Sequence, residues 1–253
     1  MIGIIGGTGL EKPGALKESK TKNVKTPYGK TAAPIRIGTL NGKKVALVSR
    51  HGFKHEFSPS VVPYQANVWA IKKLGITNVL ATSTCGSLRE KIKPGDLVVP
   101  NQVIDFTKYR LQTYKNGKGL DAHTSFGEPF SQVLNQALLQ SLKELGYRHH
   151  ANKTVVTIEG PRFSSRAESL MYRKLGADII NMTTSTEAIL CRELGICYSV
   201  LAIPTDYDCW KTDREPVTAE EILKVMAKNS QRILNVLLKT VPKINSEKHC
   251  KEH

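Results

Sequence analysis

The sequence predicts a single α/β domain built around a mixed β-sheet. Short apolar segments alternate with segments whose apolar residues recur at helical spacing, a pattern typical of strands and helices packed into one α/β domain. The strands expected at 35–40 and 44–49 flank Asn41-Gly42, the dipeptide most favoured in two-residue hairpins, so this pair is antiparallel. Neither a repeat nor a low-complexity linker divides the chain. We therefore expect one domain over residues 1–243 and a short basic tail over 244–253.

Apolar, β-branched segments bounded by turn residues mark the expected strands. They lie at residues 2–5, 35–40, 44–49, 78–82, 96–104, 154–158 and 197–203. Helical spacing of apolar residues predicts helices at 64–74, 131–145, 165–175, 184–194 and 218–239. This order interleaves the two kinds of element along the whole chain.

Residues at the helix ends support these assignments. Gly75, Gly146 and Gly195 directly follow three of the expected helices, as suits a left-handed C-cap. Two helices begin with threonine followed three residues later by glutamate, the spacing of a capping box. These pairs are Thr184 with Glu187 and Thr218 with Glu221.

The charge of the chain favours an anionic ligand without indicating nucleic acid. Lys and Arg number 37 against 22 Asp and Glu, a net charge of +15, which favours solubility and attracts anions. The basic residues are spread along the chain and belong to no nucleic-acid-binding module, so we expect no nucleic-acid partner. No run of 18 apolar residues and no signal peptide is present, which predicts a cytoplasmic protein with no membrane partner.

The cysteines and histidines predict neither a disulfide framework nor a metal site. The five cysteines are scattered and include no CxxC pair, so free thiols are expected, while a disulfide to Cys250 stays open. His51 and His55 are four residues apart, but Gly52 interrupts a helix there and no third ligand is placed. We expect no metal.

Polar clusters follow several expected strands, where α/β sheets bind their ligands. Residues 6–9, Gly-Gly-Thr-Gly, form a nest of backbone N–H groups to which Thr8 adds a hydroxyl. Arg50 and His51 add donors suited to phosphate oxygens. Ser83 and Thr84 belong to a hydroxyl-rich segment that also suits an oxyanion. These residues predict an anion site.

A second group of residues suits a flat heterocycle. Phe163, after the strand at 154–158, offers a ring on which such a group stacks. Asp206 and Asp208 follow the strand at 197–203 and face the same side if the chain is extended there. Crowding of two carboxylates raises one pKa, as a general acid at neutral pH requires.

Seven motifs connect these clusters to a known family. They are IGGTGL, SRHG, YQANVWA, CGSLRE, EGPRFSSRAES, GADIINMTT and TDYDCWK, in this order between residue 2 and about residue 211. Together they resemble the purine nucleoside phosphorylase/methylthioadenosine phosphorylase family, most closely its methylthioadenosine phosphorylase branch. The resemblance implies the nucleoside phosphorylase fold, a twisted and partly barrel-like mixed sheet flanked by helices. It also implies a homotrimer, or a dimer of trimers, with active sites near the subunit contacts.

The resemblance also implies a role for each candidate residue. Phosphate is expected among Thr8, Arg50, His51, Ser83, Thr84 and Thr183, with Thr84 between the phosphate and the sugar. Met182 is expected to touch the ribose, and Phe163 and Ser164 to line the purine pocket. Asp206 is expected to protonate N7, and Asp208 to face the 6-amino group.

The implied reaction is phosphorolysis of 5′-methylthioadenosine to adenine and 5-methylthioribose 1-phosphate, a step of purine and methionine salvage. Inorganic phosphate is then a co-substrate, and no metal or organic cofactor is expected. A 6-oxopurine or methylthioinosine phosphorylase, and a broad-range purine nucleoside phosphorylase, stay open as alternatives.

Three departures from the family pattern bear on specificity. Ser185-Thr186 replaces the Val-Pro that often precedes the glutamate of this helix. Ala219 stands where relatives carry a larger apolar group near the 5′ substituent. The tail is short, and His123 matches a histidine that relatives lend to the 5′ pocket of the adjacent subunit. Tolerance for adenosine or other 5′-modified nucleosides is therefore expected.

Overall fold

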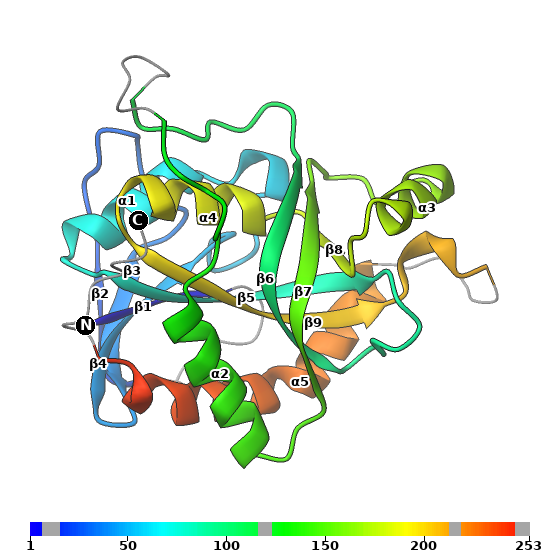
Figure 1. Ribbon diagram of the computed structural model, residues 1–253. Coiled ribbons are helices and arrows are strands. Elements are labelled where there is room, and N and C mark those ends of the chain that lie inside the picture. Colours follow the sequence, from blue (N-terminus) through cyan, green and yellow to red (C-terminus); the bar gives the residue numbers. More distant parts are fainter. Residues whose placement is uncertain (7–15, 116–122, 213–218, 246–253) are drawn as a thin grey trace.

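A nine-stranded mixed sheet forms the centre of the computed structural model, which describes residues 1–6, 16–115, 123–212 and 219–245 (Figure 1). The strands are β1 (Ile2–Gly6), β2 (Lys17–Lys22), β3 (Ile35–Leu40), β4 (Lys43–Ser49), β5 (Asn78–Ser87), β6 (Leu97–Phe106), β7 (His149–Ile158), β8 (Ile179–Asn181) and β9 (Cys197–Asp206). The helices are α1 (Tyr64–Lys73), α2 (Gln132–Glu144), α3 (Arg166–Lys174), α4 (Thr184–Glu193) and α5 (Ala219–Thr240). The predicted α/β class is confirmed.

Part of the sheet closes into a barrel. The strand order is β2-β3-β4-β1-β5-β8-β7-β6-β9, and β9 also pairs with β5, which joins the ends of the last five strands. Strand β5 therefore has three neighbours, β1 on the open side and both β8 and β9 within the barrel. The expected partly barrel-like mixed sheet is confirmed.

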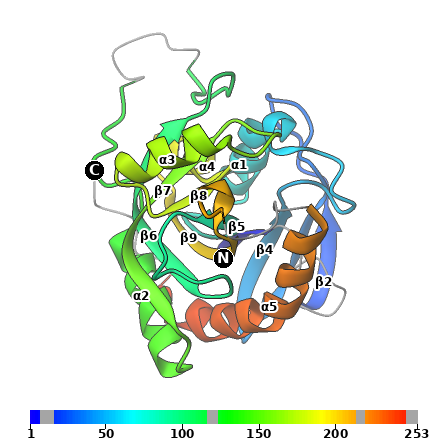
Figure 2. The same cartoon turned by 90° about the vertical axis from the view of Figure 1, so that its right-hand side faces the viewer.

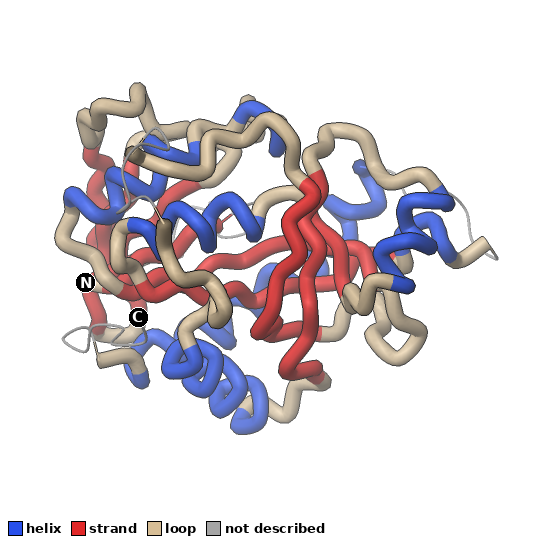
Figure 3. Tube along the Cα trace, turned by 45° about the horizontal axis from the view of Figure 1, so that its top comes forward, coloured by secondary structure: helices blue, strands red, loops and turns tan. Residues whose placement is uncertain are grey.

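Helices cover the sheet on opposite sides, as the side view shows (Figure 2). Helices α1 and α4 lie together and bury residues such as Val68 and Leu190 against one core cluster. Helices α2 and α5 lie on the other side and contribute Leu138 and Val236 to a second cluster. Helix α3 packs Tyr172 against a third, smaller cluster on the barrel. The strands thus run through the middle with helices around them (Figure 3).

Most expected elements form, and the differences have identifiable causes. The hairpin at Asn41-Gly42 forms with positive φ at both residues, as its turn type requires. Strand β2 was not expected, because its lysine-rich residues are all exposed; it adds to the edge of β3. Strand β5 continues to Ser87 instead of ending near Thr82, because it pairs with β9 through Gly86. The hydroxyl-rich segment is therefore part of a strand.

One predicted helix cap is wrong. Helix α4 begins at Thr184 after an N-cap at Thr183, and no side chain caps it, because the Glu187 carboxylate binds elsewhere. The capping box occurs instead at α3, where Ser165 accepts from the Glu168 N–H and Glu168 accepts from the Ser165 N–H. The cap expected from Thr218 and Glu221 lies outside the described residues.

Among the described residues, no helix has the length and apolar character needed to cross a bilayer.

Burial along α2 supports a first prediction. Leu138 is fully buried in the α2–α5 cluster, whereas Val133 on the same helix is 54% exposed. Leu138→Ala should lower the free energy of unfolding by about 2–5 kcal/mol, because the residual cavity adds to the lost transfer energy. Urea titration measures this loss, with Val133→Ala as the control, for which a change below about 1 kcal/mol is expected. Equal losses in the two variants would contradict the assigned packing.

Candidate active site

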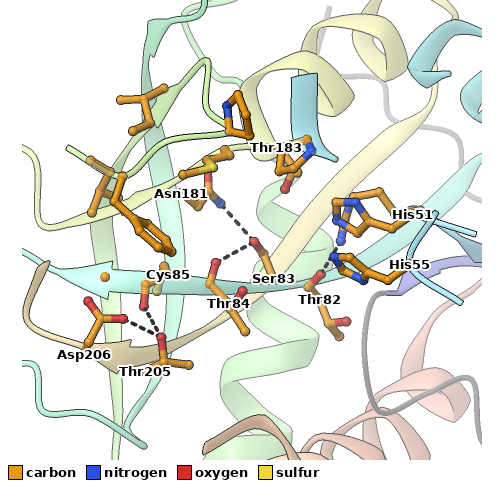
Figure 4. A pocket seen from close by; sticks show the side chains of 18 of the residues that line it. His51, His55, Thr82, Ser83, Thr84, Cys85, Asn181, Thr183, Thr205 and Asp206 are labelled. Atoms are coloured by element: carbon orange, nitrogen blue, oxygen red, sulfur yellow. Dashed lines mark hydrogen bonds between the residues drawn. The ribbon is translucent and has the colours of Figure 1, made fainter. Parts of the chain in front are cut away.

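A cavity of about 500 Å³ lies where β4, β5, β7, β8 and β9 end or run past one another. It brings together most of the predicted site residues. Those that line it are Arg50, His51, Ser83, Thr84, Phe163, Ser164, Met182, Thr183, Asp206 and Asp208. In the close view, the two labelled histidines lie at one end, Asp206 lies at the other, and Ser83 and Thr84 lie between them (Figure 4).

Three predicted residues are not among the cavity residues. Thr8 lies outside the described residues. Ala219 is the first residue of α5, but its side chain also lies outside the described part. His123 is exposed and does not line the cavity of its own chain.

Arg50, which follows β4, is buried in the wall of the cavity beside His51. Its Nε donates to Oε1 of Glu187, its Nη2 donates to Oε2 at 2.9 Å, and its Nη1 donates to the Thr82 carbonyl at 3.0 Å. Burial alone would lower the pKa of Arg50, but the charge and hydrogen bonds of Glu187 raise it above its ordinary value. Arg50 is therefore a permanent cation whose two remaining N–H groups have no acceptor among the described residues.

Glu187 is the counter-charge of this cation. Its side chain is 2% exposed, and besides Arg50 it accepts a hydrogen bond from the Tyr198 hydroxyl at 2.7 Å. The Glu187 carboxylate of α4 thus accepts three hydrogen bonds, two from Arg50 after β4 and one from Tyr198 on β9. Burial and then the charge of Glu187 raise the pKa of Tyr198, so this phenol stays a donor.

His51 enters the cavity wall as a neutral ring. Its Nδ1 donates to the Phe57 carbonyl at 2.8 Å, and its ring stacks on that of His55 with 4.3 Å between centroids. Burial and the charge of Arg50 lower the pKa of His51 to about 3. With the proton on Nδ1, Nε2 is the ring nitrogen left for a ligand.

Hydroxyl groups occupy the middle of the cavity. Ser83 donates to the Thr84 carbonyl at 2.9 Å and accepts from the Asn181 side-chain amide at 3.1 Å. Asn181 also accepts from the Thr157 hydroxyl, which fixes the end of β8 against β7. Thr183 is 5% exposed, and its hydroxyl has no partner among the described residues. It is thus available to a ligand.

The two aspartates lie at the opposite end, but the backbone between them is not extended as expected. Asp206 is the last residue of β9, and Asp208 begins a short 3₁₀ turn, Asp208–Trp210, with a positive φ of 50°. The Asp208 N–H donates to Oδ1 of Asp206 at 2.7 Å, and the Thr205 hydroxyl donates to Oδ2 at 2.6 Å. Both aspartates nevertheless line the cavity.

One carboxyl of the pair has a raised pKa. Burial and then the charge of Asp206 raise the pKa of Asp208. Hydrogen bonds from the hydroxyls of Ser169 and Ser164 act in the opposite direction and limit this rise of the pKa. Ser164 and Asp208 line the same cavity, so a hydroxyl and a carboxyl group face a ligand at this end.

Two glycines allow close packing around this end. A Cβ on Gly86 would lie 3.0 Å from Ile180 and 3.1 Å from Asp206, so glycine relieves a tight contact where β8 and β9 approach β5. Gly160 has φ +70°, and a Cβ there would lie 2.6 Å from the Met182 sulfur. The Met182 side chain thus packs directly on the backbone that leads to Phe163.

Sequence reasoning missed several residues of the site. Glu187 was taken for a helix cap, and His55 was considered only as a metal ligand. Asn181 had a visible signal, since it is a polar residue at the end of an apolar strand. Within residues 1–6, 16–115, 123–212 and 219–245, no group of three or more His, Cys, Asp or Glu side chains is placed to hold a metal ion.

The lowered pKa of His51 predicts a pH dependence of stability. Between its ordinary value of 6.5 and about 3, the folded chain binds fewer protons at His51 than the unfolded chain. The free energy of unfolding should therefore fall as the pH drops below 6.5, by at most about 1.4 kcal/mol per pH unit from one proton. Urea unfolding at pH 7, 6 and 5 should show a shallower fall in His51→Asn than in the wild type. The exposed His123→Asn serves as the control, and identical slopes for all three chains would refute the assignment.

Comparisons with known proteins agree with this geometry. The profile of the phosphorylase superfamily matches residues 1–242. The S-methyl-5′-thioadenosine phosphorylase of Thermococcus kodakarensis is 49% identical over 249 residues, covering 98% of this chain and 95% of the relative. The Danio rerio protein of the same name is 46% identical over 96% of this chain and 88% of the relative.

Solved structures show the same fold. A methylthioadenosine phosphorylase from an antarctic soil metagenomic library superimposes with a TM-score of 0.92 at 41% identity, covering 98% of this chain and 88% of the other. A mutant adenosine/methylthioadenosine phosphorylase from Schistosoma mansoni, in complex with methylthioadenosine, gives a TM-score of 0.90 at 38% identity over 98% and 92%. By its sequence and its fold, this chain belongs to the phosphorylase superfamily.

Proposed function

We propose that the chain catalyses the phosphorolysis of 5′-methylthioadenosine to adenine and 5-methylthioribose 1-phosphate. The observation that carries this proposal is a single cavity with an anion-binding end and an aspartate pair at the opposite end. The identity of 49% to a methylthioadenosine phosphorylase supports the choice of substrate.

Phosphate would bind at the end of the cavity formed by Arg50, His51, Ser83 and Thr183. The free N–H groups of Arg50 and the Thr183 hydroxyl are donors for its oxygens, and Thr183 stands at the N-terminus of α4, where backbone dipoles favour an anion. Thr84 lies between this end and the sugar, and Thr8 would complete the anion site. These groups hold phosphate against C1′, so that the reaction gains from orientation.

The leaving base would lie between Phe163, Ser164 and the two aspartates. As the C1′–N9 bond breaks, the sugar develops oxocarbenium character and a phosphate oxygen bonds to C1′ from the opposite face. Protonation of N7 makes adenine a better leaving group. Asp206, in its protonated form, would deliver this proton to N7, and Asp208 would remain a carboxylate that accepts from the base.

Base specificity would follow from the same pair. A carboxylate accepts a hydrogen bond from a 6-amino group, whereas the oxygen of a 6-oxo purine is itself an acceptor and is repelled. Asp208 therefore selects adenine over hypoxanthine. Met182 and the small Ala219 would face the sugar and its 5′ substituent.

The proposal includes no metal or organic cofactor, because the donors around the phosphate and the acid at N7 account for the chemistry. It also includes a cytoplasmic homotrimer, in which His123 would reach the 5′ pocket of an adjacent copy. Tyr109 and Leu111 support a contact between copies, because they are large side chains 86% and 71% exposed within one segment.

The direct test is adenine release from 5′-methylthioadenosine, measured with and without inorganic phosphate and with a chelator present. Release should require phosphate and should be unaffected by the chelator. Adenosine and inosine serve as comparison substrates, and inosine should be inert. Release without phosphate would instead show a hydrolase, and preference for inosine would overturn the account of base recognition.

Substitution of the two aspartates should separate their roles. Asp206→Asn should lower kcat/KM about 10²–10⁴-fold for methylthioadenosine and methylthioinosine alike, because general acid catalysis is lost. Asp208→Asn should instead shrink the preference for the 6-amino substrate, because an amide also donates to a 6-oxo group. Steady-state assays with both substrates measure the ratio. An unchanged ratio in Asp208→Asn would remove this residue from base recognition.

A further inference from the structure

Arg110 lies just outside the cavity, in the segment after β6, and its side chain is 2% exposed. Its Nε donates to Oε1 of Glu159 at 2.7 Å. Its Nη2 donates to two backbone carbonyls, that of Glu159 at 2.6 Å and that of Met182 at 3.1 Å. One guanidinium nitrogen thus joins the end of β7 to the end of β8.

The two carbonyls lie close together, since one nitrogen binds both, but they lead to different residues of the cavity wall. Glu159 follows β7 and leads to Phe163 and Ser164, which line the purine end. Met182 follows β8 and precedes Thr183, which lines the wall nearer the histidines (Figure 4). Arg110 therefore holds the two segments together beyond the last paired residues of β7 and β8, Thr157 and Asn181.

Further contacts hold Arg110 itself in place. Its guanidinium lies over the ring of Tyr64, 5.0 Å from the centroid. The Tyr64 hydroxyl donates to the Pro59 carbonyl at 2.9 Å and lies 3.4 Å from the Met182 carbonyl. The carboxylate of Glu159 accepts the N–H groups of Lys108 and Tyr109, so the segment that carries Arg110 is tied to the end of β7. Arg110 is thus fixed at both ends of its side chain.

Two hydroxyl groups of α4 contact the same region of the chain as Arg110. Arg110 Nη1 reaches Thr186 Oγ1 at 3.4 Å, and the neighbouring Ser185 hydroxyl donates to Asp105 at 2.9 Å. Asp105 lies on β6, and Arg110 lies in the segment that follows β6. Ser185 and Thr186 therefore link the start of α4 to β6 and to the segment that carries Arg110.

We propose that Arg110 is a positioning residue that sets the spacing between the purine wall and the sugar–phosphate wall of the cavity. The inference rests on the proposed function, which assigns the two walls to the two parts of the nucleoside. Arg110 touches neither substrate and acts through the carbonyls of Glu159 and Met182.

A spacing role has a distinctive consequence. Adenine alone contacts only the purine wall, so its affinity does not depend on where the other wall stands. Methylthioadenosine spans both walls, and its C1′ must also meet the phosphate. A displacement of about 1 Å between the walls is enough to cost about 10²-fold in rate.

The test uses Arg110→Met and Arg110→Lys in the full chain. We expect kcat/KM for methylthioadenosine to fall about 100-fold in Arg110→Met and about tenfold in Arg110→Lys, which keeps the charge but not the planar fork. The dissociation constant of adenine, measured by titration calorimetry, should stay within threefold of wild type in both. A parallel loss of adenine affinity, or an unchanged kcat/KM, would overturn the inference.

Arg89→Met is the matched control. Arg89 also pairs with a carboxylate and a backbone carbonyl, those of Asp178 and Arg173, but it does not line or bridge the cavity. The kcat/KM of Arg89→Met for methylthioadenosine should stay within twofold of wild type. A loss as large as in Arg110→Met would count against a specific positioning role of Arg110. If the proposed function is wrong, the wild-type chain does not release adenine from methylthioadenosine in the presence of phosphate. If only this inference is wrong, the wild-type chain is active but the ratio of kcat/KM between Arg110→Met and wild type stays near one.

Discussion

The buried ion pair between Arg50 and Glu187 is the interaction on which the anion end of the cavity depends. It joins the end of β4 to α4, and Tyr198 of β9 donates to the same carboxylate. Removing one partner would leave a buried charge without a counter-charge, which typically costs about 3–5 kcal/mol. Because Thr183 begins the helix that carries Glu187, and Ser83 follows the carbonyl that Arg50 binds, both hydroxyls take their positions from this pair.

Much of the fold, and most of the predicted site residues that line the cavity, could be found from the sequence because their signals are local. The Asn41-Gly42 hairpin follows from the backbone preferences of its two residues. Arg50 stands directly after a strand, as Phe163 and Asp206 stand near the ends of theirs, and strand ends meet at one side of such a sheet. The family resemblance added Met182 and Thr183, whose residue types alone indicate no ligand.

What the sequence did not predict depends on distant contacts. Glu187 lies 137 residues from Arg50, and its local spacing fits a helix cap equally well. Arg110 meets Met182 across 72 residues. The polar end of β5 has no apolar pattern, yet its pairing with β9 keeps it in a strand. The spacing of Asp206 and Asp208 suggested an extended backbone between them, but Asp208 has a positive φ and begins a turn.

The two ends of the cavity come from separate parts of the chain, with β5 running between them. Residues of segment 50–55 and Thr183 line the end with the histidines, and residues of segments 161–164 and 205–208 line the end with the aspartates. On the proposed function, the phosphate that attacks and the base that leaves are recognised by different segments of the same scaffold. A change in the turn after β9 would then alter which nucleobase binds while it leaves the phosphate site as it is.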